Sequence, residues 1–256
     1  MPQPEGPTSV VIVYSAEDKR ACTAVRARWH ETSAQDGCCM ATCSLPPGRS
    51  VSDELGDEAL LVSIRYLDRY HLVQDVDSES STRPLSLLFF ERISADYDSI
   101  VNIERNRHNV AILLSALLEG AAPDSDRPIL DFGCGTGLAL KVAQAHGVQL
   151  MGVDACGGMR SVARGRGLAV FAADELSSSN ARGMFSSYVF HLLERPDELQ
   201  HLWSLLPADA CLVANFHKGR NVERVTTWLN ECGAKATELA VDDEGRGHGV
   251  YVKYTK

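Results

Sequence analysis

The sequence lacks an excess of positive charge and any long apolar run. Its 256 residues include 25 Lys and Arg against 34 Asp and Glu, which gives a net charge of −9. Phosphate backbones are bound chiefly by Lys and Arg, so this balance disfavours general nucleic-acid binding. No stretch approaches the roughly 20 apolar residues of a membrane span. The first apolar run, Val10–Tyr14, is too short for a signal peptide and has no basic flank. We therefore expect a cytoplasmic protein without a membrane partner.

A paired arrangement of cysteines is also missing. Eight cysteines are scattered along the chain, and only Cys38, Cys39 and Cys43 cluster. A zinc site usually combines two spaced pairs of Cys or His, and here the second pair is missing although His30 lies nearby. We expect no metal site, and we interpret the cluster as a cysteine-rich surface segment in a reducing compartment.

The remaining composition is that of a globular protein, with 45 % hydrophobic and 23 % charged residues. At about 150 residues per domain, the length allows one large domain, or one domain plus a smaller appendage. Residues 75–84 have almost no apolar content and predict a linker. We expect an N-terminal accessory or lid region at 1–74, a helical segment at 85–126 before the core, and a core at 127–256.

The N-terminal region mixes strand and helix patterns. Val10–Tyr14 is typical of a buried strand. Ser15 is the expected N-cap of a helix within Ala16–His30, Pro46–Gly48 marks a turn, and Ser52–Tyr70 predicts one or two helices. These features indicate a small α/β unit.

From Arg127 onward, strand and helix patterns alternate. The expected strands are Ile129–Phe132, Gln149–Val153, Ala169–Ala172, a segment within Gly183–Phe190, Ala210–Asn215, Thr237–Val241 and Gly249–Tyr254. Such alternation predicts parallel strands with crossover helices on both faces. Only Asp242–His248 separates the last two strands, which is too short for a parallel crossover and requires an antiparallel hairpin. The expected fold class is α/β, with a Rossmann-like, doubly wound, seven-stranded sheet, a terminal antiparallel hairpin and an N-terminal α/β accessory region.

The segment from Ile129 to Leu138 combines a strand, a glycine-rich loop and a helix. The strand ends at Asp131 and Phe132, and Gly133, Gly135 and Gly137 follow at alternate positions. Glycines there permit a tight turn and let a ligand approach the backbone. The following helix offers unpaired N–H groups to a negative group such as a carboxylate. The spacing is G-x-G-x-G, which differs from the dinucleotide fingerprint G-x-G-x-x-G.

Two further strands end in an acid. Asp154 follows the second strand, where a carboxylate can accept hydrogen bonds from both ribose hydroxyls. Asp174 follows the third strand and is placed to accept from an adenine amino group. A strand-ending Asp is common in turns, but the two acids follow the glycine loop in the order that a nucleotide site needs.

At these residues the chain resembles the class I S-adenosylmethionine (SAM)-dependent methyltransferases. Leu130–Leu138 is similar to their first motif, Gly152–Ala155 to the second and Ala173–Asp174 to the third. The resemblance covers about half of the chain, residues 127–256. It extends less specifically to residues 89–118, which include Tyr97 in a segment similar to the family's pre-core helix.

The resemblance implies SAM as the cofactor. The implied cofactor-binding residues are Asp131, Gly133, Cys134, Gly135, Gly137, Asp154, Ala155, Asp174 and Tyr97. Asp131 and the three glycines would face the methionine part, Asp154 would hold the ribose and Asp174 the adenine amine. The thiol of Cys134 is expected to be a small buried side chain rather than a reactive group.

Methyl transfer from a sulfonium is an in-line displacement, for which the protein mainly supplies position and a dry site. A base is needed only if the acceptor must lose a proton first. His191 is the candidate catalytic residue, because it lies just past the fourth strand, where open α/β sheets form their reactive crevice. The alternative is an imidazole that only packs. The segment Phe185–Leu192 is shorter than its counterpart in many relatives.

The acceptor is expected to be a small molecule that carries an O, N or C nucleophile. The acidic charge balance favours this class, and the motifs Asn-Pro-Pro-Tyr and Pro-Cys, which the family uses on other substrates, do not occur. The sequence leaves the oligomeric state open.

A second hypothesis concerns the N-terminal region. Val10–Lys19 and Pro47–Ser50 are similar to parts of Toll/interleukin-receptor-like domains. The alternative function is therefore a SAM-binding regulatory or docking protein without transfer activity, which acts through its N-terminal region. Loss of activity on removal of residues 1–80 would favour a lid, and retained activity would favour a separable docking segment.

Overall fold

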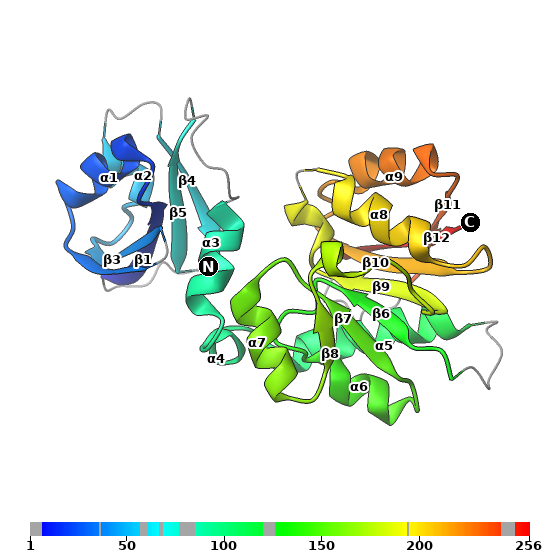
Figure 1. Ribbon diagram of the computed structural model, residues 1–256. Helices are drawn as coiled ribbons and strands as arrows, with labels where there is room; N and C mark the ends of the chain where they lie inside the picture. Colours follow the sequence, from blue (N-terminus) through cyan, green and yellow to red (C-terminus); the bar gives the residue numbers. More distant parts are fainter. Residues whose placement is uncertain are drawn as a thin grey trace. The chain divides into compact units, whose positions relative to one another are not determined.

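The chain forms two compact units, Met1–Ile93 and Ser94–Lys256 (Figure 1). The computed structural model describes residues 7–35, 37–56, 61–66, 69–76, 85–119, 126–193, 195–241 and 249–256. Each unit is built on a sheet of its own.

The first unit is a mixed sheet with the strand order β2-β3-β1-β5-β4. Its strands are β1 Thr8–Ser15, β2 Glu31–Gln35, β3 Cys38–Leu45, β4 Leu61–Tyr66 and β5 Tyr70–Asp75, and its helices are α1 Lys19–Arg26, α2 Val51–Leu55 and α3 Leu85–Ile93. Strands β1 and β5 are parallel, and the other neighbours are antiparallel. Helices α1 and α2 cover one face and α3 the other. The expected small α/β unit is therefore present.

The first helix begins later and ends earlier than the pattern in Ala16–His30 predicted. Asp18 is its N-cap, and its Oδ1 accepts a hydrogen bond from the backbone N–H of Ala21 at 2.8 Å. The predicted cap, Ser15, is wrong because this residue still pairs with Cys38 as the last residue of β1. The helix ends at Arg26, and the chain returns to the sheet as β2.

The prediction of helices across Ser52–Tyr70 is also mostly wrong. Among the residues of this segment that the structure describes, only those of α2, Val51–Leu55, are helical, with a capping box between Ser50 and Asp53. Leu61–Tyr66 forms the edge strand β4 and pairs antiparallel with β5. Pairing with a neighbouring strand outweighs helical composition here, since strand preference depends strongly on context.

The cysteine cluster is buried rather than on the surface. Cys38, Cys39 and Cys43 lie on β3 with exposures of 3, 1 and 8 %, and all three are free thiols. Burial raises the pKa of each thiol to about 11. Such thiols act as small hydrophobic side chains. Among the described residues, no group of three or more His, Cys, Asp or Glu is placed to hold a metal ion.

The second unit contains the expected seven-stranded sheet, with the order β11-β12-β10-β9-β6-β7-β8. Its strands are β6 Ile129–Phe132, β7 Leu150–Val153, β8 Ala169–Phe171, β9 Gly183–Ser187, β10 Cys211–His217, β11 Lys235–Leu239 and β12 Gly249–Thr255. Strand β12 is antiparallel to both β10 and β11, and the other neighbours are parallel. The doubly wound fold with a terminal hairpin is confirmed. The connecting residues 242–248 lie outside the described part of the chain.

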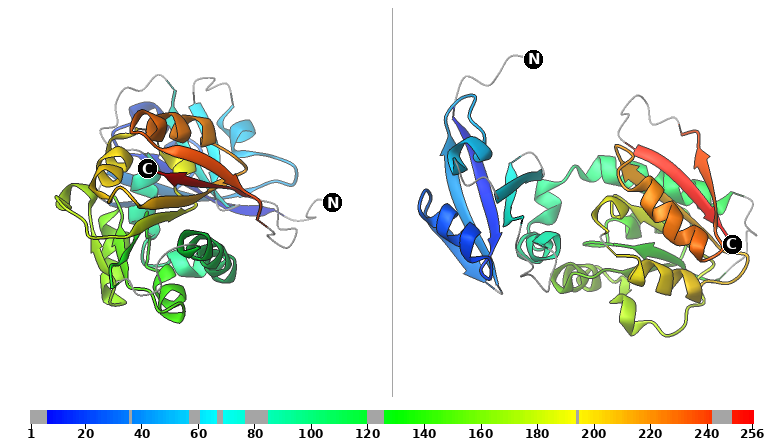
Figure 2. Two further views of the ribbon diagram at one scale, coloured as in Figure 1. Left: turned by 90° about the vertical axis from the view of Figure 1, so that its right-hand side faces the viewer. Right: turned by 90° about the horizontal axis from the view of Figure 1, so that it is seen from above.

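Helices cover both faces of this sheet. They are α4 Tyr97–Ile100, α5 Ile103–Leu118, α6 Ala139–Ala145, α7 Gly157–Gly165, α8 Asp197–Leu205 and α9 Val222–Glu231, with short 3-10 turns η1 Ala173–Glu175 and η2 Phe190–Leu192. Helices α5 and α6 pack on one face, and α8 and α9 on the other (Figures 1 and 2). Trp203 of α8 is 1 % exposed and belongs to the core of its face. None of the described helices is both long and apolar enough to cross a membrane.

The unit boundary differs from the expected linker at residues 75–84, of which 77–84 lie outside the described part. Helix α3, expected before the core, packs on the first sheet instead. Phe89 of α3 is fully buried, and its ring packs in a T-shaped arrangement with that of Tyr70 of β5, with 5.3 Å between ring centroids. The division therefore falls after Ile93.

Candidate active site

The glycine loop after β6 has a backbone that only glycine adopts readily. Gly133, Gly135 and Gly137 have φ values of 73°, 53° and 80°. A Cβ on Gly133 would overlap the side chain of Val189, and one on Gly137 would lie 3.3 Å from Cβ of Ala163 in α7. A Cβ on Gly135 would meet no atom within 4 Å. The loop is thus packed at both ends and open in the middle, where a ligand can approach the backbone.

Asp154, directly after β7, is joined to this loop. Its Oδ2 accepts from the N–H of Gly135, and its Oδ1 from the N–H of Cys156, both at 2.8 Å. The guanidinium of Arg160 donates to the carbonyl oxygens of Asp154 and Ala155 at 2.7 and 2.9 Å. The carboxylate is therefore held beside the open part of the loop.

The electrostatics of the site favour a cationic ligand group. Asp131 is 3 % exposed, and burial followed by the charge of Asp154 raises the pKa of Asp131 well above its ordinary value. Burial, then Asp154 and Asp98, raise the pKa of Tyr97 in α4 to about 12. A positive group among these side chains would favour the ionised carboxylates. The sulfonium and ammonium groups of SAM fit this environment.

The remaining predicted cofactor residues lie at the same strand ends. Cys134 is 7 % exposed and packs against Gly152, where a Cβ would lie 2.6 Å from its sulfur. Burial raises the pKa of this thiol well above its ordinary value, so it is unreactive. Asp174 lies in η1, directly after β8, and both Asp174 and Ala155 are exposed. The structure thus groups the predicted residues at one edge of the sheet, and their cofactor contacts stay predictions.

His191 lies in η2, beyond the end of β9. Its ring centroid is 5.7 Å from that of His217, the last residue of β10, and the ring of Tyr188 is 6.3 Å from that of His217. Among the described residues, no group hydrogen-bonds the buried Nδ1 of His191. Burial, then His217 and Arg220, lower the pKa of His191 to about 4. The imidazole is therefore neutral near pH 7.

A buried polar network behind Tyr188 was missed by the sequence reasoning. Tyr251 donates to Oδ1 of Asn109 at 2.9 Å, and Nδ2 of Asn109 donates to the hydroxyl of Tyr188 at 2.8 Å. The backbone N–H of Tyr188 donates to Oδ1 of Asn215 at 2.7 Å. These bonds hold Tyr188 at a φ of 58°, which costs a non-glycine residue roughly 1–2 kcal/mol. The sequence feature that could have revealed this network is Asn215, a polar residue inside the largely apolar strand β10.

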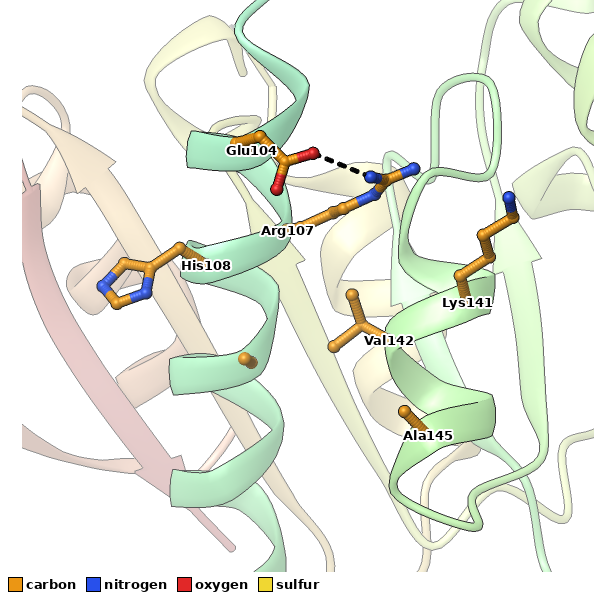
Figure 3. Close-up of a pocket in the computed structure, with 7 residues that line it drawn as sticks. Glu104, Arg107, His108, Lys141, Val142 and Ala145 are labelled. Atoms are coloured by element: carbon orange, nitrogen blue, oxygen red, sulfur yellow. Dashed lines mark hydrogen bonds and ion pairs between the residues drawn. The ribbon is translucent and has the colours of Figure 1, made fainter.

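A depression of about 490 Å³ lies elsewhere, between α5 and α6 (Figure 3). It is lined by Glu104, Arg107, His108, Ala111, Lys141, Val142 and Ala145. Glu104 and Arg107 form an ion pair there at 2.9 Å. The depression contains none of the predicted site residues and lies beside the helices, whereas those residues follow the ends of the strands.

The doubly wound sheet and the glycine loop with its strand-ending acids define the second unit as a nucleotide-cofactor-binding α/β domain. Residues 103–213 match a family model described as a methyltransferase domain. The second unit is therefore a SAM-dependent methyltransferase domain of class I, and SAM is its cofactor. The match lies wholly in the second unit, so the resemblance of Val10–Lys19 to Toll/interleukin-receptor-like domains finds no support.

Solved structures of methyltransferases are also similar to the chain. One from Thermotoga maritima, titled a possible histamine N-methyltransferase, is 16 % identical, covers 65 % of this chain and 97 % of its own, and has a TM-score of 0.46. The plantazolicin methyltransferase BpumL is 14 % identical, with 64 % and 89 % covered and a TM-score of 0.49. Magnesium protoporphyrin IX methyltransferase from Synechocystis PCC 6803 is 14 % identical, with 69 % and 86 % covered and a TM-score of 0.45. No curated protein sequence matches the chain.

Proposed function

We propose that the protein transfers a methyl group from SAM to an O, N or C nucleophile of a small molecule. The observation that carries this proposal is the glycine loop, open at Gly135 and tied by that residue's N–H to Asp154. SAM, when bound, supplies the methyl group and its own leaving group, so the protein mainly has to position the reactants.

In this proposal each strand end binds one part of the cofactor. Asp154, which its backbone partners hold beside the open part of the loop, accepts hydrogen bonds from the ribose hydroxyls. Asp174 accepts from the adenine amine. Asp131 faces the methionine part, where a neighbouring cation would stabilise the ionised carboxylate that burial disfavours. The small side chain of Ala155 leaves room beside the ribose.

The acceptor site lies past β9 and β10, where Tyr188, His191 and His217 gather. His191 is the proposed catalytic residue. With a pKa of about 4 it is a weak base, so it suits an acceptor that needs a hydrogen-bond partner more than strong proton removal. The small size of the acceptor is supported by the net charge of −9, which disfavours nucleic acid.

The test incubates the purified full chain with SAM and a panel of small molecules that carry a hydroxyl, amine or activated carbon. Formation of S-adenosylhomocysteine (SAH) together with a methylated product supports the proposal, and Asp154→Ala should abolish both. If His191 participates, the wild-type rate should stay flat above about pH 5, because the imidazole is already neutral there. A rate that falls as the pH is lowered, with a midpoint near pH 6.5, would contradict this role for His191.

The alternative is a SAM-binding regulatory protein that acts through the first unit. It predicts SAH binding without turnover on any acceptor. We propose instead that the N-terminal region serves as a lid for the acceptor. A fragment that begins at Ser94, once a cooperative melting transition shows that it is folded, should bind SAH but lose transfer activity. Full activity of this fragment would favour a separable docking unit.

A further inference from the structure

Three side chains join helix α4 to the glycine loop. Thr136 lies between Gly135 and Gly137 and is 1 % exposed. Its hydroxyl donates to Oδ1 of Asp98 in α4 at 2.6 Å and accepts from Nη1 of Arg166 at 3.1 Å. Nη2 of Arg166 also pairs with Oδ2 of Asp98. Each of the three side chains thus contacts the other two.

Arg166 differs from the other arginines that follow Asp154. Arg160 and Arg164 donate to backbone carbonyl oxygens, Arg164 to that of Val170 at 3.0 Å. Arg166 is the C-cap of α7 and reaches a carboxylate and a buried hydroxyl on two other segments. These arginines therefore do not form one anion-binding patch, and Arg166 instead connects α7, the glycine loop and α4.

Tyr97 is the sequence neighbour of the cluster. Tyr97 immediately precedes Asp98 and begins α4. The pKa of its hydroxyl is raised by burial and then by the charge of Asp154, the proposed ribose acid. Helix α4 has only four residues and no side-chain hydrogen bond at its N-cap, so its own hydrogen bonds hold it weakly. The bonds of Asp98 to Thr136 and Arg166 anchor it to the loop.

The hydroxyl of Thr136 is the strongest element of the cluster. The side chains of Arg166 and Asp98 are 35 % and 26 % exposed, and ion pairs of this kind contribute little by themselves. A buried hydroxyl that donates to a carboxylate contributes more, because the charge strengthens the bond and an unpaired hydroxyl would be costly. Removal of this hydroxyl should therefore release α4 more effectively than removal of the exposed pair alone.

We propose that Asp98, Thr136 and Arg166 form a latch that positions Tyr97 against the cofactor and so sets the affinity for SAM and SAH. The inference rests on the proposed cofactor site. The three latch residues are positioning residues, since they act through Tyr97. Helix α4 is also the first helix after the first unit ends at Ile93, so the latch anchors the chain where it enters the second unit.

Calorimetric titration of SAH into full-length variants tests the latch. Thr136→Val keeps the shape but removes the hydroxyl, and Asp98→Ala removes the acceptor at a partly exposed position. Each should weaken SAH binding about tenfold, which corresponds to about 1.4 kcal/mol. Thr136→Ser keeps the hydroxyl and should bind within about twofold of the wild type. The control Glu104→Gln removes an exposed ion pair of α5 in the same unit and should bind as the wild type does.

A double-mutant cycle with Tyr97→Ala separates positioning from a general structural effect. In the Tyr97→Ala background, Asp98→Ala should cause no further loss of SAH affinity. An undiminished loss there would overturn the latch, as would wild-type affinity of both folded Asp98→Ala and Thr136→Val. If the wild type itself does not bind SAH, the cofactor site is wrong and the latch with it. Wild-type binding with unaffected latch variants refutes the latch alone.

Discussion

Substitution of Asp154 should separate the ribose contact from the rest of the cofactor site. Both carboxylate oxygens already accept one backbone N–H at 2.8 Å, from Gly135 and from Cys156. We propose that the carboxylate also accepts from the two ribose hydroxyls, since a carboxylate oxygen can accept more than one hydrogen bond. A hydrogen bond to a charged acceptor contributes about 1.5–3 kcal/mol. Loss of two such bonds in Asp154→Ala amounts to about 3–6 kcal/mol, or roughly 10²- to 10⁴-fold in SAH affinity.

Asp154→Asn should give an intermediate result. The amide keeps one acceptor oxygen, but its NH₂ group faces one of the two backbone N–H donors and cannot accept from it. We expect the loss of one charged bond, about 1.5–3 kcal/mol, or roughly 10- to 150-fold. The order wild type, Asn, Ala in SAH affinity is therefore the prediction.

Calorimetry at constant pH measures these affinities, and melting curves establish that each variant is folded. Asp209→Ala removes an exposed turn carboxylate of the same unit and is the matched control, with unchanged affinity expected. NADH is the control ligand and should not bind, because the loop has the G-x-G-x-G spacing. A folded Asp154→Ala variant that binds SAH within about threefold of the wild type would refute the reasoning.

Three further substitutions test other parts of the site. Burial raises the pKa of Asp131, so the folded protein loses stability as the pH rises through that pKa and the carboxyl group ionises. Asp131→Asn should therefore raise the melting temperature of the ligand-free protein at pH 7 while weakening SAH binding. A lower melting temperature would contradict the raised pKa of Asp131. Gly133→Ala should lower the free energy of unfolding, measured with denaturant, by more than about 1–2 kcal/mol. Adding Val189→Ala to this variant should restore only part of that stability, because it relieves the overlap with the new Cβ but not the positive φ. Asn109→Ala leaves the Tyr188 hydroxyl without its amide donor and should lower transfer activity while SAH affinity is unchanged; an equal loss of SAH affinity would place the network in the cofactor site instead.

Much of the second unit follows from local patterns. Alternating strand and helix segments, with too few residues between β11 and β12 for a crossover, determined both the seven strands and the reversed β12. The glycine loop and Asp154 were equally visible, because turns with positive φ need glycine and Asp154 directly follows an apolar strand segment. These features depend on residues that are close together in the chain.

The first unit was harder to predict, because its elements depend on distant partners. Leu61–Tyr66 is a strand because it pairs with β5, and Cys38–Leu45 is an inner strand because β1 and β2 pair with it on either side. Asp18 replaces Ser15 as the cap of α1 because Ser15 is still paired in the sheet. In each case a neighbouring strand outweighed the local preference.

The same distinction holds for the site. The sequence by itself determined the class of fold, the glycine loop and the acids that follow β7 and β8, because backbone conformation and strand order leave a local signature. Only the tertiary structure decided which side chains meet. Asp98 reaches Thr136 across 38 positions and Asn109 reaches Tyr188 across 79, and the pKa of His191 is lowered by burial and by charges from other segments. Hydrogen bonds and electrostatic effects of this kind depend on distance in space, which the order of residues along the chain does not specify.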